Sequence, residues 1–505
     1  MRSTVVGAAQ AGLRCTSRRP APQAPKFIYQ SSRTISATPA RREAERKWST
    51  PLASKLAGAI DVTGPMPLAS YMRMCLTGDV GGYYTGAIGS GRDQFGTRGD
   101  FITSPEISQV FGELIGIWFV AEWMSQGRPR SGVELMEVGP GRGTLMDDIL
   151  RTIRNFKDMA SAIDAVYMVE ASKELRVAQK NLLCGEDAAM RESKEGWHST
   201  CKHSHLPIVW TDSIKAVPKY ASKTPFIVAH EFFDALPIHA FQVVEVPPTQ
   251  QPLTSSGSPR SASSNTSSPT RQWREMVVSP TPEGTTQADL GTPKSAQSEP
   301  VPDFQLTLSP AQTRHAMYLP YLSPRYRALQ STLDAVIEVC PDASLYVSDF
   351  AVRIGGSEAN PKPHPSGAAL VLDYGPADTI PTNSLRGIRQ HKEVSPFSYP
   401  GLVDLSADVD FLGLVEAATR ASEGVECHGP VDQAHFLESM GIQQRAEMLA
   451  NKAGDDDKKT AIQRAWKRLV DRGPNGMGKV YKALAILPEN AGKRRPVGFG
   501  GDISA

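Results

Sequence analysis

Short, mainly apolar runs recur along the chain from Val133 onward, and longer amphipathic segments separate them. The runs cover residues 133–138, 165–169, 207–210, 226–229 and 368–372. Strands that are buried on both faces have this composition, and an intervening helix returns the chain so that the next strand runs parallel. The sequence therefore predicts an α/β fold with a parallel sheet and helices on both faces. A second, smaller α+β lobe is expected beside it.

A glycine-rich turn follows the first apolar run. Gly139, Gly141 and Gly143 stand where a buried strand should end and a helix begin. Glycines let a ligand approach the backbone closely, and a helix start offers free N–H groups. A dinucleotide-binding turn would need its third glycine one residue later, at the position of Thr144. This spacing disfavours a nicotinamide oxidoreductase.

Acidic residues stand at the ends of three successive predicted strands. Glu137 precedes the first glycine by two residues, which suits the ammonium group of a methionine moiety. Glu170 ends the second strand, where a carboxylate can accept hydrogen bonds from both ribose hydroxyls. Asp212 follows the third strand and could accept one from an adenine amino group. Together they predict S-adenosyl-L-methionine as the cofactor and a class I methyltransferase (Rossmann-like) sheet, whereas the glycines alone would also fit a merely structural turn.

A second acidic turn follows the fourth apolar run. Glu231 and Asp234 are three residues apart and would share one face of a helical turn. Ligands of open parallel sheets lie beyond the carboxyl ends of the strands, so both carboxylates are candidate catalytic groups. Such a pair could hold a guanidinium and help accept its proton. Asp373, after the fifth run, is a further catalytic candidate; the alternative is that Asp234 caps a helix and Glu231 forms a surface ion pair.

A helix start lies upstream of the sheet. Thr103 or Ser104 can cap it, Pro105 suits its first turn, and Glu106 favours the positive end of the helix dipole. Apolar residues at helical spacing between 107 and 119 predict that the helix continues with one wide buried face. We assign Thr103, Pro105 and Glu106 to the cofactor site.

The first 42 residues contain eight Arg and Lys and no acidic residue, with the first acid at Glu43. This composition predicts a mitochondrial transit peptide at 1–42, although a basic disordered tail would look similar. Without those cations the rest of the chain is mildly acidic, which provides no electrostatic footprint for nucleic acid. No apolar stretch is long enough to span a membrane. The six cysteines are scattered and read as reduced thiols, and no residue group has the spacing of a metal site.

The remaining chain divides into segments. We expect the first part of the methyltransferase core at 67–238, a second lobe at 239–366, the end of the core sheet with a C-terminal lobe at 367–488, and a tail at 489–505. The ranges 247–270 and 279–302 are rich in Ser, Pro and Thr and are predicted to be disordered insertions. Between them, Trp273–Val278 should pair with Ala240–Val246 as a hairpin. The sequence does not indicate the oligomeric state.

Several blocks of this sequence resemble the MidA family of mitochondrial and bacterial methyltransferases. The blocks include Gly99–Gly116 (GDFITSPEISQVFGELIG), Leu135–Gly143, His230–Pro237 (HEFFDALP), Glu338–Pro341, Leu370–Gly375 (LVLDYG) and Asp404–Phe411 (DLSADVDF). The resemblance spans about 67 to 488 apart from the insertions. It implies a protein substrate, with symmetric dimethylation of an arginine on a core subunit of respiratory complex I during its assembly in the mitochondrial matrix.

The resemblance also implies roles for individual residues. The three glycines from Gly139 to Gly143 match the cofactor loop, and Glu231 and Asp234 match the acidic active-site turn. His230 is a departure, because the family commonly has Asn before the Glu. Two other functions stay open at this point, a catalytically silent assembly chaperone and a methyltransferase acting on a small molecule or RNA. The complete set of acidic residues speaks against the first, and the acidic chain and large second lobe speak against the second.

Overall fold

The computed structural model of the chain describes residues 46–86, 102–246, 270–292, 297 and 299–501. Residues from Trp48 onward form one compact unit. The predicted transit peptide at 1–42 and nearly all of the predicted insertion at 247–270 lie outside the described residues, so both stay predictions. Within the described ranges, no helix is both long and apolar enough to cross a bilayer.

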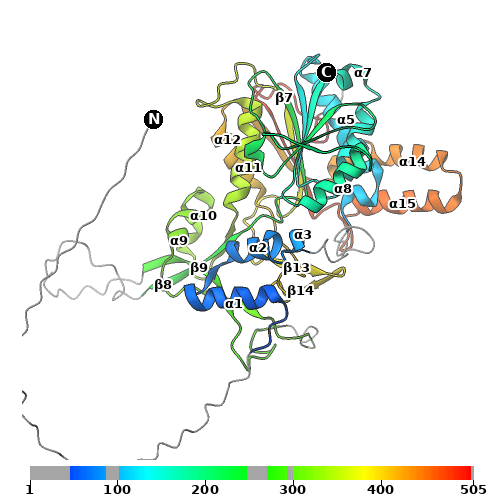
Figure 1. Ribbon diagram of the computed structural model, residues 1–505. Coiled ribbons are helices and arrows are strands. Elements are labelled where there is room, and N and C mark those ends of the chain that lie inside the picture. Colours follow the sequence, from blue (N-terminus) through cyan, green and yellow to red (C-terminus); the bar gives the residue numbers. More distant parts are fainter. Residues whose placement is uncertain (1–45, 87–101, 247–269, 293–296, 298, 502–505) are drawn as a thin grey trace, which may run out of the picture. The chain divides into compact units, whose positions relative to one another are not determined.

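A nine-stranded sheet forms the centre of this unit (Figure 1). Its order is β16 (Val425–Asp432), β17 (Tyr481–Pro488), β12 (Ala368–Tyr374), β7 (Thr224–His230), β2 (Val133–Val138), β3 (Ile163–Val169), β6 (Pro207–Thr211), β5 (Trp197–Thr200) and β4 (Arg191–Glu192). The five predicted strands β2, β3, β6, β7 and β12 are all present and parallel. Strand β17 runs antiparallel between β12 and β16. The carboxyl ends of the parallel strands therefore meet at one edge, where a ligand site is expected.

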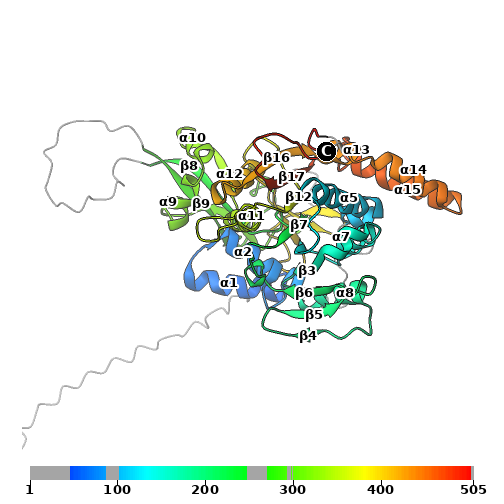
Figure 2. The same ribbon diagram turned by 90° about the horizontal axis from the view of Figure 1, so that it is seen from above.

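Helices cover both faces of this sheet. One face is packed by α5 (Gln109–Ser125), α6 (Thr144–Ile153), α7 (Lys157–Ala162), α8 (Lys173–Cys184), α13 (Gln433–Ser439), α14 (Ile442–Lys452) and α15 (Asp456–Val470). The other face is packed by α11 (Pro341–Gly355) and α12 (Phe411–Ala421). Figure 2 shows α11 and α12 across the sheet from α5, and α14 with α15 as a hairpin that projects beyond the strands. The predicted two-sided covering is confirmed.

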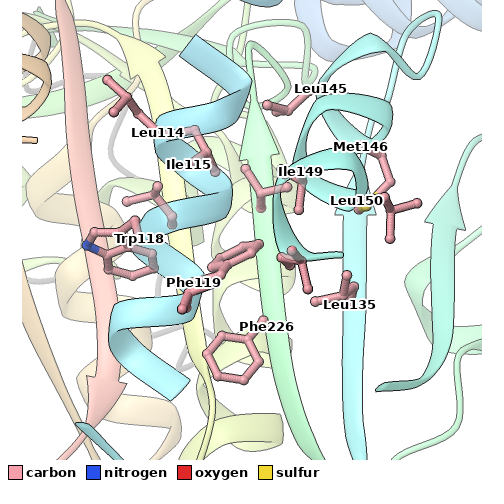
Figure 3. Close-up of a cluster of buried hydrophobic side chains, with 14 of the residues drawn as sticks. Leu114, Ile115, Trp118, Phe119, Leu135, Leu145, Met146, Ile149, Leu150 and Phe226 are labelled. Carbon is pink, nitrogen blue, oxygen red and sulfur yellow. The ribbon is translucent and has the colours of Figure 1, made fainter. Parts of the chain in front are cut away.

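Side chains of α5 and α6 pack on β2 and β7 in the largest core cluster (Figure 3). Leu145 and Ile149 of α6 are buried there, and Phe119 of α5 packs on Phe226 with ring centroids 5.5 Å apart. Helical spacing after the glycine turn would also place Phe156 on the buried face of α6, but Phe156 is 39% exposed because α6 ends at Ile153.

The helix predicted from Thr103 is divided in two. Thr103 precedes α4 (Ser104–Ile107), and the Ser108 side chain then caps α5 by accepting the Val110 N–H at 3.3 Å. A serine competes for backbone donors and so starts a new helix here. Helix α4 contacts α5, α6 and α15.

A second sheet of five strands lies beside the first. It contains β1 (Met66–Pro67), β9 (Thr270–Pro280), β8 (His239–Val246) and β11 (Val336–Val339), with β10 (Phe304–Leu308) also paired to β9. Strands β8 and β9 are antiparallel with Ala240 opposite Met276, which confirms the predicted hairpin. A small third sheet joins β14 (Lys392–Val394), β13 (Arg386–Arg389) and β15 (Asp404–Ser406).

The element boundaries differ from the predicted segments in three places. Helices α1 (Pro51–Thr63) and α2 (Leu68–Thr77) pack on the second sheet, although α2 was assigned to the core. Helix α11 packs on the nine-stranded sheet, although it falls in the range 239–366. Strand β9 continues to Pro280, inside the insertion predicted at 279–302. Each of these elements packs on or pairs with segments that are distant in the sequence.

The remaining short elements connect these layers. They are α3 (Tyr83–Gly86), η2 (Ile214–Ala216), α9 (Arg314–Tyr318), η5 (Leu319–Tyr321), α10 (Pro324–Ala328) and η6 (Leu329–Ser331). Helices α9 and α10 lie over β8, β9 and β11, where Ala316 and Tyr326 join a small separate core.

Candidate functional site

A pocket with an empty volume of about 1180 Å³, partly open to solvent, lies at the carboxyl ends of β2, β3 and β7. Most of the residues predicted from sequence line it: Thr103, Pro105, Glu106, Glu137, Gly139, Gly141, Glu170, Asp212 and Glu231. Gly143, Asp234 and Asp373 are outside its lining. The sequence therefore located the pocket, and the structure separates the residues that face it from those behind it.

The glycine turn brings the backbone to the pocket wall. Gly139, Gly141 and Gly143 have φ angles of +67°, +51° and +85°, a region that other residues rarely adopt. A Cβ at Gly139 would lie 2.5 Å from Cδ2 of Phe232, so the acidic turn packs directly on the glycine turn. Gly143 is the N-cap residue of α6 and therefore positions the start of that helix next to the pocket.

Glu137 is the deepest acidic group of the pocket. Its residue is 3% exposed, and its Oε2 atom has no hydrogen-bond partner among the described residues. Burial raises the pKa of Glu137 well above its usual value, and the charge of Glu170 raises it further. A buried carboxyl oxygen without a donor fits a cationic amine, which would supply both the charge and the missing hydrogen bond.

Glu170 is held in place by its neighbours. Its Oε1 accepts the Ser172 N–H at 2.8 Å, and its Oε2 accepts from Nε2 of Gln179 at 3.2 Å. Burial raises the pKa of Glu170 to about 7, while these hydrogen bonds lower it. An oriented carboxylate at this strand end fits a pair of vicinal hydroxyls. Glu137 and Glu170 together therefore fit the two ends of an S-adenosylmethionine molecule.

Asp212 has a different environment from the one predicted. It lines the pocket, but its carboxylate forms an ion pair with Arg176, whose guanidinium lies 4.0 Å above the Trp197 ring. The side chain of Asp212 is 62% exposed. An adenine amino group would have to share this carboxylate with Arg176.

The N-terminal helices contribute a wall of the pocket that sequence analysis missed. Leu76 and Thr77 at the end of α2, and Tyr84 and Thr85 in α3, line it. The Tyr84 carbonyl accepts a hydrogen bond from Oγ of Ser172 at 3.0 Å. This bond joins α3 to the segment that directly follows Glu170. The Gly81-Gly82-Tyr83-Tyr84 motif was the available signal, because paired glycines before aromatic residues are typical of a close packing contact.

Glu231 is the acidic residue of the second turn that faces the pocket. Its φ is +48°, which ends β7 abruptly, and its N–H donates to the Leu372 carbonyl at 2.9 Å. Its Oε1 is buried and has no hydrogen-bond partner among the described residues. Burial raises the pKa of Glu231 well above its usual value, as do the charges of Asp234 and Asp373. A group in this state can take up a proton or pair with a cation.

Asp234 and Asp373 turn away from the pocket. Oδ2 of Asp234 accepts the hydroxyl proton of Tyr374, whose ring in turn lies 4.6 Å below the Arg386 guanidinium. The Asp373 carboxylate accepts four backbone N–H groups, from Phe232, Phe233 and Asp234 at one oxygen and from Tyr374 at the other. The turn is not helical, because of the positive φ at Glu231, so Glu231 and Asp234 do not share one face as predicted.

One group of side chains in the described residues has the ligand types of a metal site. His239, Glu275 and His315 bring one ligand atom each to within 4.8 Å of one another on β8, β9 and α9. The Glu275 carboxylate already receives hydrogen bonds from both imidazoles and from Thr313. Because every oxygen of this carboxylate has a donor, the group is a complete hydrogen-bonded network that joins the three elements.

Comparison with known families bears directly on this pocket. Residues 114–431 match the family model described as S-adenosyl-L-methionine-dependent methyltransferase. The chain belongs to this family. S-adenosyl-L-methionine is therefore the cofactor, in agreement with the fit of Glu137 and Glu170 to its two ends, and the resemblance to MidA-type enzymes is confirmed.

Curated relatives of this methyltransferase cover most of its length. It is 34% identical to "Protein arginine methyltransferase NDUFAF7, mitochondrial" of Rattus norvegicus over 450 residues, which is 88% of this chain and 86% of the relative. It is 35% identical to the Drosophila melanogaster homologue over 443 residues, 86% and 85% of the two chains. A crystal structure from Burkholderia thailandensis, described as a likely methyl transferase bound to S-adenosyl-homocysteine, has the same fold with a TM-score of 0.58 and 22% identity, covering 89% of this chain and 92% of that one.

Proposed function

We propose that this methyltransferase has the class I architecture and transfers methyl groups to arginine residues of a protein. The strand order β6-β3-β2-β7-β12-β17-β16, with β17 as the antiparallel member, supports the class I assignment. The names of its relatives support arginine as the acceptor.

The observation that carries this proposal is the position of Glu231. Its unpartnered Oε1 lies in the same pocket wall as the cofactor residues Glu137, Gly139 and Glu170. A buried carboxyl oxygen without a hydrogen-bond donor provides a binding partner for a planar cation such as a guanidinium. Among the described lining residues, the other buried carboxyl oxygen without a partner is Oε2 of Glu137, which we assign to the ammonium group of the cofactor.

The mechanism assigns a separate task to each group. When bound, S-adenosyl-L-methionine supplies an electrophilic methyl group on a positively charged sulfur. Glu137 would hold the ammonium group of the cofactor, and Glu170 would hold its ribose hydroxyls, in the pocket that Glu231 also lines. Glu231 orients the guanidinium for in-line attack and receives the proton that the nitrogen loses. Asp373 holds the backbone of the turn that carries Glu231.

The substrate and location follow from the family resemblance. The finer proposal is symmetric dimethylation of an arginine on a core subunit of complex I, in the mitochondrial matrix. Residues 1–42 would direct the chain there and then be removed. Asp212 contacts the adenine of the cofactor. Asp234 shapes the active-site turn through its hydrogen bond with Tyr374.

Methyl transfer from isotope-labelled S-adenosyl-L-methionine to proteins of complex I-deficient mitochondria tests this function. We expect a dimethylated arginine on one complex I subunit, absent with Glu231→Gln and present with the exposed control Glu358→Gln. If the label appeared on a small molecule instead of a protein, the substrate would be a small molecule and the protein-arginine proposal would be wrong. Cofactor binding without any transfer would favour the assembly-chaperone function.

A further inference from the structure

Two polar atoms without hydrogen bonds face each other in the pocket wall. Nε2 of His230 lies 3.2 Å from Oε1 of Glu231, and the geometry does not make a hydrogen bond between them. His230 is 8% exposed and lines the pocket together with Glu231. The Phe111 ring packs edge-on against the imidazole with centroids 5.1 Å apart, which fixes its orientation.

Nε2 of His230 is an acceptor in the neutral tautomer that carries its proton on Nδ1. Burial lowers its pKa to about 3, so the imidazole is neutral at physiological pH. An acceptor nitrogen next to an acceptor oxygen is unfavourable unless a donor lies between or in front of them. In the absence of substrate, the proton of a protonated Glu231 can fill this role. In the complex, the donor must come from the ligand.

The neighbouring acidic groups are either hydrogen-bonded or outside the pocket lining. Asp234 accepts from Tyr374 through Oδ2, and its unpartnered Oδ1 belongs to a residue outside the lining. Asp373 accepts from the backbone of the turn. Glu170 accepts from Ser172 and Gln179. Among the described residues, His230 is therefore the group next to Glu231 that both lines the pocket and has a side-chain nitrogen without a partner.

We propose that His230 and Glu231 together form the acceptor pair for the substrate guanidinium, each taking one N–H. This rests on the proposed arginine methyltransferase function and adds His230 to it. Asp234, predicted as the second carboxylate, has no part in the contact. A planar guanidinium presents adjacent N–H groups in a fixed fork, which matches two acceptors a few ångströms apart better than a single-point ammonium does.

The chemical step then balances. A guanidino nitrogen forms a bond to the methyl carbon while the carbon–sulfur bond breaks. The electron pair of the broken carbon–sulfur bond stays on sulfur. The nitrogen loses one proton, which Glu231 accepts and releases to solvent. His230 stays neutral and keeps the second N–H in place, so that the attacking lone pair points at the methyl group.

Saturation-transfer NMR with N-acetyl-arginine amide as the probe tests the pair without requiring turnover. The full chain is used with saturating S-adenosyl-homocysteine. We expect His230→Phe to weaken probe binding about tenfold, as for loss of one hydrogen bond to a charged donor, with unchanged affinity for S-adenosyl-homocysteine. His230→Asn, whose side-chain oxygen can also accept, should restore most of the binding.

His428→Phe is the matched control, because His428 forms another His–Glu pair, 2.9 Å from Glu426 on β16 and outside the pocket lining. Its binding of the probe should equal that of the wild type. Equal probe binding by wild type and His230→Phe would overturn the proposal, as would preference for n-butylamine over the arginine probe. Probe binding that depends on His230, in a protein that methylates no protein, would keep this inference and reject the proposed function.

Discussion

Oδ2 of Asp373 accepts the backbone N–H of Phe233 at 2.9 Å. The same oxygen accepts from Phe232 at 3.1 Å, and Oδ1 accepts from Tyr374 at 2.9 Å. Asp373 is 0% exposed and ends β12, next to the strand that carries Glu231. Its carboxylate therefore determines the path of the acidic turn, which makes it a positioning residue and not the catalytic group expected from sequence.

Asp373→Asn should lower both stability and methyl transfer. The new amide group would place N–H donors against the N–H groups of the turn, a loss of about 1–3 kcal/mol for unsatisfied buried donors. Chemical denaturation and initial rates measure the two effects. The exposed Asp378→Asn is the control. A variant at Asp373 with wild-type stability and rate would show that the turn keeps its shape without this carboxylate.

Gly139→Ala should abolish cofactor binding. The added methyl group would meet Phe232 at 2.5 Å and would force alanine into a φ of +67°. The strained backbone alone costs about 1–3 kcal/mol. Gly454→Ala, where a Cβ meets nothing within 4 Å, provides a control of the same chemistry. Calorimetric titration with S-adenosyl-L-methionine measures binding, and wild-type affinity in Gly139→Ala would contradict the close approach of the two turns.

The parallel sheet was predictable because its strands are apolar on both faces. That signal depends only on neighbouring residues, and it located β2, β3, β6, β7 and β12. The carboxyl ends of these strands then indicated Glu137, Glu170 and Glu231 as pocket residues, because parallel strands end at one edge.

The orientation of individual acidic groups was not predictable. Glu231 has a left-handed backbone, so the turn is not helical and its side chain does not share one face with that of Asp234. The ion pair of Asp212 with Arg176 and the wall formed by Tyr84 join residues from separate segments. Composition and spacing carry no information about such contacts.

The affinity for S-adenosyl-L-methionine should depend on pH through Glu170. Its pKa is raised to about 7 in the free protein, and ribose hydroxyls donate only to its ionised form. Cofactor binding therefore favours loss of the Glu170 proton. The affinity for S-adenosyl-L-methionine is highest well above pH 7 and falls as the pH drops through 7. Between pH 8 and pH 6 the dissociation constant should rise about tenfold, as expected for one proton per site.

Titration calorimetry at both pH values measures this dependence. Glu170→Gln removes the titrating carboxyl, so its affinity should be weaker at pH 8 and change less across the range. The same dissociation constant at pH 6 and pH 8 in the wild-type protein would mean that Glu170 stays ionised or lies outside the ribose contact.

The segment expected to be a C-terminal tail is anchored in the core. Arg494 binds the carboxylate of Glu122 with both terminal nitrogens, at 2.9 and 2.6 Å, and Glu122 is 0% exposed. The Val497 carbonyl accepts from Nε1 of Trp118 at 3.1 Å, and Phe499 packs near the same ring. Three contacts thus hold 494–499 against α5, the helix that covers β2 and β7.

Arg494→Ala should therefore destabilise the protein although it lies far from the pocket. It leaves the buried Glu122 carboxylate without its cation, which costs about 3 kcal/mol. The exposed neighbour Arg495→Ala should change the free energy of unfolding by less than about 0.5 kcal/mol. Adding Glu122→Gln to Arg494→Ala should restore part of the loss, because a neutral amide is cheaper to bury unpaired. Urea unfolding of the four proteins measures these differences, and an Arg494→Ala variant as stable as Arg495→Ala would mean that the segment does not hold α5 in solution.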